Sequence, residues 1–242
     1  KSKTDGFVIG ISGGIDSALT STLCASTGLP TICIVMPIMQ NINEVNRASN
    51  HIKWLQKKFN NVIHKSIDLN NVFNSFKNTV DQKNDKNNFL SLANSRSRLR
   101  MTTLYYFAGI NNCLVAGTGN KVEDFGIGFY TKYGDGGVDI SPIADLNKTD
   151  VFEISKKLGV LNEIVKAKPT DGLWDDGRTD EDQIGATYKE LEWAMQQKVL
   201  NKKLIDFTGR EKEVFQILKN FNKQNLHKMN PIPIYKVPEN LK

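Results

Sequence analysis

The sequence predicts an α/β fold, a doubly wound parallel sheet with helices on both faces. Short apolar segments alternate four times with segments whose apolar residues have helical spacing, which is typical of a parallel sheet. Glycines, prolines and polar residues separate these segments. The 242 residues contain no internal repeat and no linker, so residues 1–242 are expected to form a single domain with a sizeable core.

The first part of the chain contains three expected strands and two expected helices. GFVIGIS, residues 6–12, is an apolar strand, and a helix follows over 15–27. TICIVMP, residues 31–37, is the second strand, and NVIHKSI, residues 61–67, is the third. The segment 43–59 between them has apolar residues at helix-compatible spacing: Val45, Ile52, Leu55 and Phe59.

A third expected helix and a fourth expected strand follow a polar connector, DQKNDKNN, over 81–88. The long helix is expected over 89–109, with one apolar stripe: Leu92, Leu99, Tyr106 and Ile110. NNCLVAG, residues 111–117, is the fourth strand. The polar, glycine-rich segment 118–148 is expected to be a loop that builds a site, since parallel sheets bind ligands at the carboxyl ends of their strands. A short helix follows over 148–158.

The last part of the chain combines a polar loop with helical sequence. Segment 166–182 contains proline, glycines and several acids, which predicts a mobile surface loop. Trp174 in this loop either covers a site or anchors the loop. Two further helices and a proline-punctuated tail, NPIPIYKVP over 230–238, complete the chain.

Composition narrows the classes of function. The net charge of +6 comes mainly from basic residues spread through amphipathic helical sequence, which favours a solvated face over a nucleic-acid surface. Attraction of a phosphate-rich small molecule is a further alternative. The three cysteines, Cys24, Cys33 and Cys113, lie in apolar contexts without paired spacing, as buried free thiols do in a reducing compartment. No apolar run is long enough to span a membrane and no signal peptide is visible, so a cytoplasmic protein is expected.

SGGIDS, directly after the first strand, predicts a phosphate-binding turn. Gly13 and Gly14 let a ligand approach the backbone, and the following helix directs its positive end toward the turn. No lysine follows the glycines, so this is not a Walker loop. Asp16 would repel a bare phosphate, which indicates a hard cation such as Mg²⁺ between them. The alternative is an ordinary helix start capped by Ser12 or Asp16.

SGGIDS after a strand resembles the loop of the PP-loop ATP pyrophosphatases, which cleave ATP between the α and β phosphates. GTGNKVE and TKYGDGGVD, within residues 117–160, resemble the ammonia-dependent NAD synthetase family, and so do 168–192 and 227–233. The likeness thus runs from about residue 6 to 233 and implies the Rossmann-like fold of that superfamily. It implies that ATP adenylates the nicotinate carboxylate of deamido-NAD and releases pyrophosphate. Ammonia then attacks this NAD-adenylate, giving NAD and AMP.

The resemblance also assigns roles to residues of this chain. Mg²⁺ is expected on Asp16 and Glu123. Lys148 is expected to reach the ATP phosphates, and Asp135, beside the ammonia site, to accept a proton from ammonium. The residues expected to bind ATP are Gly10, Ile11, Ser12, Gly13, Gly14, Ile15, Asp16, Ser17, Thr118, Lys148 and Thr170. The residues expected to bind deamido-NAD are Arg98, Lys132, Asp139, His227 and Lys228.

Several of these residues have other interpretations. Arg96 and Arg100 lie on the same expected helix as Arg98, and all three are plausible surface residues. The stretch after Glu123 is one residue longer than in some relatives, which makes Asp124 an alternative metal ligand.

The resemblance implies a homodimer with deamido-NAD near the interface. No cysteine lies in a nucleophile context, so we expect no glutaminase domain and direct use of ammonia, with neither a nucleic acid nor a membrane as partner.

Two hypotheses compete with that of an ammonia-dependent NAD synthetase. A tRNA-modifying PP-loop enzyme would need a reactive cysteine pair and a concentrated basic patch, and a non-catalytic nucleotide-binding module would not need Asp16 and Glu123 together.

Overall fold

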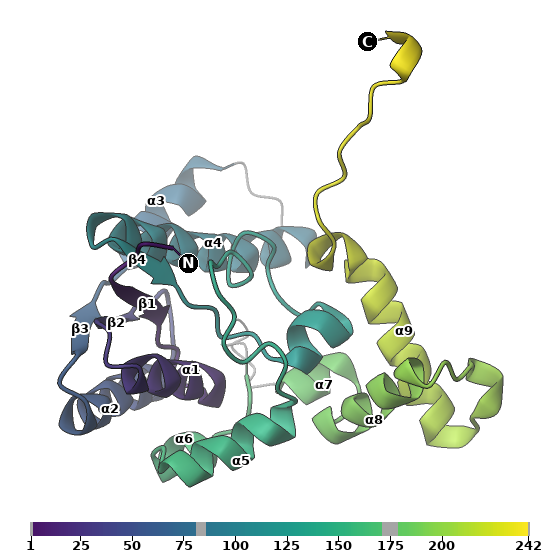
Figure 1. Ribbon diagram of the computed structural model, residues 1–242, viewed down its shortest axis with the longest axis horizontal. Helices are drawn as coiled ribbons and strands as arrows, with labels where there is room; N and C mark the ends of the chain where they lie inside the picture. Colours follow the sequence, from purple (N-terminus) through teal and green to yellow (C-terminus); the bar gives the residue numbers. More distant parts are fainter. Residues whose placement is uncertain (1, 81–85, 171–178, 242) are drawn as a thin grey trace.

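A four-stranded parallel sheet forms the centre of the N-terminal half of the molecule (Figure 1). The structure is a computed structural model that describes residues 2–80, 86–170 and 179–241. The strand order is β3-β2-β1-β4, and the strands are β1 (Gly6–Gly10), β2 (Thr31–Val35), β3 (Val62–Ser66) and β4 (Cys113–Val115). The predicted parallel sheet is confirmed, although each strand is shorter than its apolar segment: β1 and β2 end earlier, and β3 and β4 are shorter at both ends.

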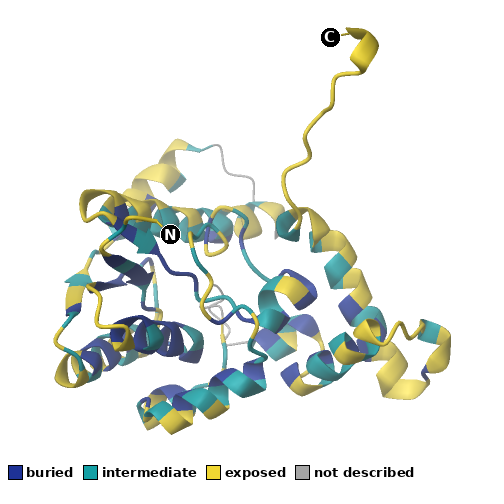
Figure 2. Ribbon diagram, viewed as in Figure 1, coloured by how far each residue is buried: buried dark blue, intermediate teal, exposed yellow. Residues whose placement is uncertain are grey.

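Helices α1 (Ile15–Ser26) and α2 (Ile42–Lys58) cover one face of this sheet. Successive strand residues point to opposite faces, so Ile9 of β1 faces these two helices and Val8 faces away. The helices contribute small and branched side chains to this layer of the core: Cys24, Ala25, Ala48, Ile52 and Leu55. Buried residues are accordingly concentrated in β1, β2 and α1, whereas β3 at the edge of the sheet is mostly exposed (Figure 2).

The other face is covered by α4 (Lys86–Ile110), against which α3 (Asn70–Thr79) packs. Helix α3 was not expected, because its sequence is rich in asparagine and buries only Phe73. Its first turn is fixed by Asp68, whose Oδ1 accepts a hydrogen bond from the Asn70 amide at 2.8 Å. Helices on both faces confirm the predicted doubly wound arrangement.

The segment after β4 is not a continuous loop, as 118–148 was expected to be. A π-helical segment, η1 (Lys121–Ile127), lies within it because Asn120 caps its start and its apolar residues pack against the C-terminal helices. The C-terminal helices are α7 (Asp180–Ile184), α8 (Tyr188–Val199) and α9 (Gly209–Met229). Two further helices, α5 (Lys148–Leu158) and α6 (Asn162–Val165), pack against α1 instead. Short 3₁₀ turns complete the described chain at η2 (Leu204–Asp206) and η3 (Glu239–Leu241).

Two sets of elements therefore meet where β1 and β4 end: the sheet with its helices, and the helical layer built on η1 (Figure 1). After α9 the chain extends away from the rest of the molecule. Within residues 2–80, 86–170 and 179–241, none of the helices combines the length and the apolar character that crossing a membrane requires.

Candidate active site

A cavity of about 650 Å³ lies at the carboxyl ends of β1 and β4. The chain proceeds from β1 to β2 and β3 on one side and returns to β4 on the other. Open α/β sheets bind ligands at such a switch in strand order. The β1–α1 turn, α4, η1 and α9 all contribute to the walls of the cavity.

The SGGIDS turn forms one wall of this cavity. Ser12 and Ser17 lie with their hydroxyl oxygens 3.1 Å apart, and the Gly14 amide donates to Ser12 Oγ at 3.1 Å. Gly14 is the N-cap residue of α1 and no side chain caps the helix, so the alternative of a helix start capped by Ser12 or Asp16 is wrong. The start of α1 thus directs its positive end toward the cavity, which suits a phosphate.

Gly13 is required in this turn for two reasons. Its φ is +87°, and a Cβ at this position would lie 2.5 Å from the Glu44 carbonyl oxygen of α2. The turn is therefore pressed against α2, and a side chain at this position would force the two apart.

Gly13→Ala is expected to destabilise the protein and to weaken ATP binding. Gly28→Ala is the matched control, because Gly28 has a φ of +80° but no atom within 4 Å of a built Cβ. Left-handed backbone alone costs a non-glycine residue about 1–2 kcal/mol, so the control should lose about that much stability. Gly13→Ala should lose about 1–3 kcal/mol more through overpacking. Urea unfolding and ATP calorimetry would measure both, and equal losses in the two variants would contradict the close contact.

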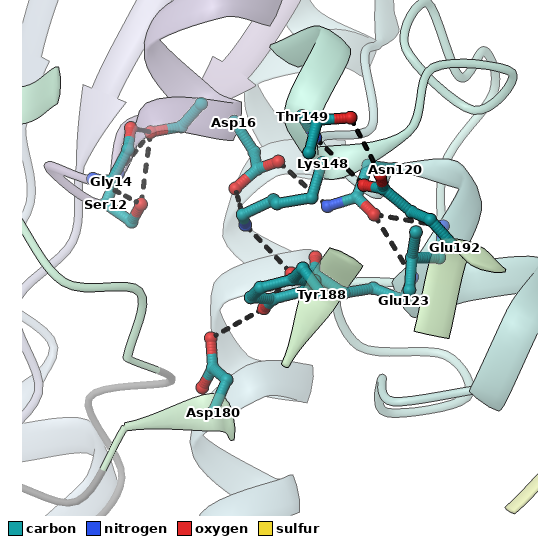
Figure 3. Close-up of polar contacts among 12 residues, drawn as sticks. Ser12, Gly14, Asp16, Asn120, Glu123, Lys148, Thr149, Asp180, Tyr188 and Glu192 are labelled. Atoms are coloured by element: carbon teal, nitrogen blue, oxygen red, sulfur yellow. Dashed lines mark hydrogen bonds and ion pairs between the residues drawn. The ribbon is translucent and has the colours of Figure 1, made fainter. Parts of the chain in front are cut away.

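Lys148 lies between the two carboxylates that the sequence suggests as metal ligands (Figure 3). Its Nζ is 2.6 Å from Asp16 Oδ2 and 2.9 Å from Glu123 Oε1, and the residue is only 2% exposed. Burial by itself would lower the pKa of Lys148, but the two carboxylates raise it above its usual value. The raised pKa favours the charged form of Lys148 at neutral pH.

The two carboxylates respond differently to the same surroundings. Burial raises the pKa of Asp16 despite the nearby Lys148 ammonium. Burial acts in the same direction on Glu123, but the Lys148 ammonium and hydrogen bonds from Tyr188 and Lys148 bring its pKa below the usual value. Glu123 is thus the more firmly ionised of the pair.

Asn120 and the start of α5 hold this arrangement in place. Asn120 is fully buried; its Oδ1 accepts from the Val122 and Glu123 amides at 3.1 Å, and its Nδ2 donates to Asp16 Oδ1 at 2.9 Å. One side chain therefore joins the start of η1 to the β1–α1 turn. Lys148 is the first residue of α5, where a reciprocal cap between Asn147 and Asp150 fixes the backbone.

The C-terminal helices add a hydroxyl to the same site (Figure 3). Tyr188 OH donates to Glu123 Oε1 at 2.6 Å and lies 3.2 Å from Asp180 Oδ2. Next to Lys148, the Thr149 hydroxyl donates to Glu192 Oε2 at 2.8 Å and joins α5 to α8. The site thus depends on contacts between the sheet and the helices that follow it.

Comparison with known proteins shows the family of this chain. The family model described as NAD synthase matches residues 1–232. The chain therefore belongs to the NAD synthase family. The NH(3)-dependent NAD(+) synthetase of Carboxydothermus hydrogenoformans is 39% identical over 212 residues, which cover 87% of this chain and 84% of that relative.

Solved structures of NAD synthase relatives share the fold. The structure of NMN synthetase from Francisella tularensis is similar with a TM-score of 0.80 and 31% identity, covering 98% of this chain and 90% of that one. The NH3-dependent NAD synthetase from Campylobacter jejuni has a TM-score of 0.77 at 25% identity, covering 98% and 92% of the two chains.

Most residues expected to bind ATP or metal line the cavity: Gly10, Ile11, Ser12, Gly14, Ile15, Asp16, Ser17, Thr118, Glu123, Lys148 and Thr170. Gly13 packs against α2 instead. The Thr170 hydroxyl donates to Glu44 Oε1 at 3.2 Å. Trp174 lies outside the described residues.

The residues expected to bind deamido-NAD are less closely grouped. Lys228 lines the cavity and donates to the Gly128 and Tyr130 carbonyls. Arg98 Nε donates to the Lys132 carbonyl at 3.3 Å, and Lys132 Nζ donates to the His227 carbonyl at 2.6 Å, outside the cavity lining.

Asp139 does not line the cavity, and its contacts lie elsewhere. Its carboxylate accepts from Tyr105 OH at 3.0 Å and from the Val115 amide at 2.8 Å. The structure therefore does not bring all the expected substrate residues into the one cavity.

Two further acidic residues of this region, Asp135 and Asp124, have raised pKa values. Asp135 accepts from Ser97 Oγ at 2.7 Å and from the Thr131 amide at 3.0 Å, and its enclosed position still raises its pKa. Burial raises the pKa of Asp124 to about 8, helped by the neighbouring Asp135 and Glu123. That Asp124 is an alternative metal ligand stays a prediction.

Asn120, Tyr188 and Asp180 were not among the expected site residues. Asn120 stands three residues before Glu123 at the start of a helical segment, so its capping role was visible in principle. Tyr188 and Asp180 carried no such signal, because only tertiary packing brings α7 and α8 to η1.

Proposed function

We propose that this protein is an ammonia-dependent NAD synthetase. In this reaction the nicotinate carboxylate of deamido-NAD attacks the α-phosphate of ATP, and pyrophosphate leaves. Ammonia then attacks the acyl carbon of the adenylate. AMP leaves, and the acyl group becomes the amide of NAD. The observation that carries the proposal is the Asp16–Lys148–Glu123 arrangement beside a glycine turn, in a chain of the NAD synthase family.

The donors at this position fit Mg²⁺. Carboxylate oxygens are the ligands that Mg²⁺ prefers, and it usually takes only one or two of them together with substrate phosphates. The part of the chain that the structure describes has no group of three His, Cys, Asp or Glu side chains that could hold a metal ion without such phosphates. Asp16 and Glu123 would hold the ion, which would neutralise charge on the phosphates during adenylation.

The chain's own groups would bind and orient the nucleotide. The turn from Gly10 to Ser17 presents amides and hydroxyls to the phosphates, and Thr118 and Thr170 lie around the same cavity. Lys148, whose raised pKa favours its charged form, is placed to stabilise negative charge on the phosphates as pyrophosphate departs. Ser12 and Ser17 already bond to each other and to the Gly14 backbone, which limits the reorganisation that the turn needs for the reaction.

Asp135 is the proposed proton acceptor for ammonium. The raised pKa of this carboxyl favours taking up a proton more than an ordinary aspartate would. Ser97 and the Thr131 amide hold one of its oxygens, so its orientation is fixed.

Asp135→Asn is expected to slow amide formation by about 10²–10⁴-fold, the usual contribution of a positioned base, while ATP cleavage continues. In the unaltered protein, amidation should fall as the pH drops through the raised pKa of Asp135, because the base becomes protonated. Pyrophosphate release and NAD formation would be followed in parallel against pH. Equal loss of both activities in Asp135→Asn would contradict this role.

The state of the cysteines supports direct use of ammonia. Burial raises the pKa of Cys24 and of Cys33 to about 12, and it also raises the pKa of Cys113. None of these thiols is suited to attack glutamine, because the thiolate is the nucleophilic form. Free buried thiols also fit the cytoplasmic location expected from the sequence.

A homodimer is part of the proposal. Helix α4 carries Arg98 and exposes Tyr106 and Ile110, which a second copy could cover. The group formed by Arg98, Lys132 and His227 lies outside the cavity, as expected if deamido-NAD binds near an interface. Sedimentation at several concentrations, with and without deamido-NAD, would test the dimer.

Nicotinate mononucleotide is the second candidate substrate, because one of the similar structures is an NMN synthetase. Its carboxylate would be amidated by the same steps.

The deciding experiment incubates the protein with Mg-ATP, deamido-NAD and either ammonium or glutamine, and a parallel series replaces deamido-NAD by nicotinate mononucleotide. The proposal expects NAD with ammonium and a larger kcat/KM for deamido-NAD. Equal rates with glutamine would overturn the ammonia dependence, and a preference for the mononucleotide would establish the second candidate instead.

A further inference from the structure

Tyr188 is a buried side chain to which the proposed function gives no role. It is the first residue of α8 and is 6% exposed. Its hydroxyl donates to Glu123 Oε1, the same oxygen that accepts from Lys148 Nζ. The Lys148 ammonium also lies over the Tyr188 ring, 4.9 Å from its centre. A phenol and an ammonium thus converge on one carboxylate oxygen.

The distances show which carboxylate the hydroxyl serves. A phenol has one proton to donate, and Glu123 Oε1 at 2.6 Å is much nearer than Asp180 Oδ2 at 3.2 Å. The shorter distance is that of a strong bond to an ionised acceptor. The hydroxyl therefore bonds mainly to Glu123.

The backbone and ring of Tyr188 are held independently of Glu123. The Tyr188 amide donates to Glu181 Oε1 at 2.8 Å, and a reciprocal cap between Thr187 and Glu190 fixes the first turn of α8. The ring packs in a core of side chains from η1, α7, α8 and α9: Val122, Ile127, Ile184, Leu191, Val214 and Phe215. A rigidly placed hydroxyl can set the orientation of a neighbouring carboxylate.

We propose that Tyr188 is a positioning residue that fixes the Glu123 carboxylate in the orientation needed to bind a divalent cation. This inference rests on the proposed function, in which Lys148 interacts with phosphates when the nucleotide is bound. The Lys148 ammonium is then shared with the phosphates and holds Glu123 Oε1 less strongly, and the Tyr188 hydroxyl keeps the carboxylate in place.

Tyr188→Phe tests this, because it removes the hydroxyl and keeps the ring. Mn²⁺ serves as the probe, and its free concentration is measured by electron paramagnetic resonance with α,β-methylene-ATP present. We expect Mn²⁺ affinity to fall about tenfold, the size of a lost charge-assisted hydrogen bond. Tyr105→Phe is the matched control, since it also deletes one bond from a tyrosine hydroxyl to a carboxylate, here Asp139 at 3.0 Å, but leaves Glu123 untouched. Its Mn²⁺ affinity should stay within about twofold, as expected for a change away from the metal ligands.

A double-mutant cycle decides whether Tyr188 acts through Glu123. In a Glu123→Gln background, Tyr188→Phe should have almost no further effect on Mn²⁺ affinity. A full tenfold loss in that background, or unchanged Mn²⁺ affinity in Tyr188→Phe with only a lower melting temperature, would overturn the inference. Failure of the unaltered protein to bind Mn²⁺ would overturn it too. Absence of NAD formation together with the expected Mn²⁺ results would instead overturn the proposed function alone.

Discussion

Asp16→Asn is expected to reduce pyrophosphate release from ATP by at least about 10³-fold, which corresponds to about 4 kcal/mol of transition-state stabilisation. The variant removes the negative charge that would hold a cation against the phosphates, and it removes one of the two partners of Lys148. The amide cannot replace a carboxylate as a strong ligand for a hard cation. Pyrophosphate release in a coupled assay would measure the loss.

The fold should survive this change. Glu123 remains beside Lys148 at 2.9 Å, so the buried ammonium keeps one carboxylate partner. The amide also keeps the shape of the side chain, so the free energy of unfolding should fall by less than in a variant that leaves a buried charge without any partner. Asp145→Asn is the control, because Asp145 is an exposed partner of Lys121 away from the carboxylate pair. Pyrophosphate release near the normal rate in Asp16→Asn would contradict the metal role.

Lys148→Met is expected to affect stability and activity together. It leaves two buried carboxylates facing each other without their cation, and removing one partner of a buried ion pair typically costs about 3–5 kcal/mol. Adenylation should fall by about 10²–10³-fold through loss of one stabilising donor. Urea unfolding without divalent ions and pyrophosphate release would measure the two effects.

Lys121→Met is the matched control for this variant. Lys121 Nζ lies 2.8 Å from Asp145 Oδ1, but the two side chains are 41% and 97% exposed. Exposed pairs contribute at most about 1 kcal/mol, so the control should be nearly as stable as the unaltered protein. Mn²⁺ added to Lys148→Met without nucleotide should restore part of the lost stability, because the unpaired carboxylates attract a replacement cation. A Lys148→Met protein as stable as Lys121→Met would show that the buried pair is not what holds this site together.

The sheet and the glycine turn were predictable because their signals are local. Apolar segments at regular intervals define the strands, and parallel sheets bind ligands at the carboxyl ends of their strands, which predicts that Asp16 and Glu123 lie at the same edge. The structure places both there, with Lys148 between them. That residues 1–242 form a single domain stays a prediction.

The remaining parts of the site depend on packing that the sequence pattern does not carry. Helix α3 has low helical propensity and depends on its contact with α4, and η1 forms because Asn120 caps it and α8 and α9 cover it. Tyr188 is 65 residues from Glu123 in the sequence, and nothing between them indicates that their side chains meet. Contacts between distant helices were therefore the least predictable part of the site.

The buried cysteines have a practical consequence for studying this protein. The chain has three cysteines, and they are 4%, 0% and 8% exposed. With raised pKa values and little access, they should react slowly with maleimides while the fold is intact. A single cysteine introduced on the surface of α9 would thus take up a fluorophore or spin label selectively. The unaltered sequence already provides the background for spectroscopic measurements of how the C-terminal helices respond to nucleotide.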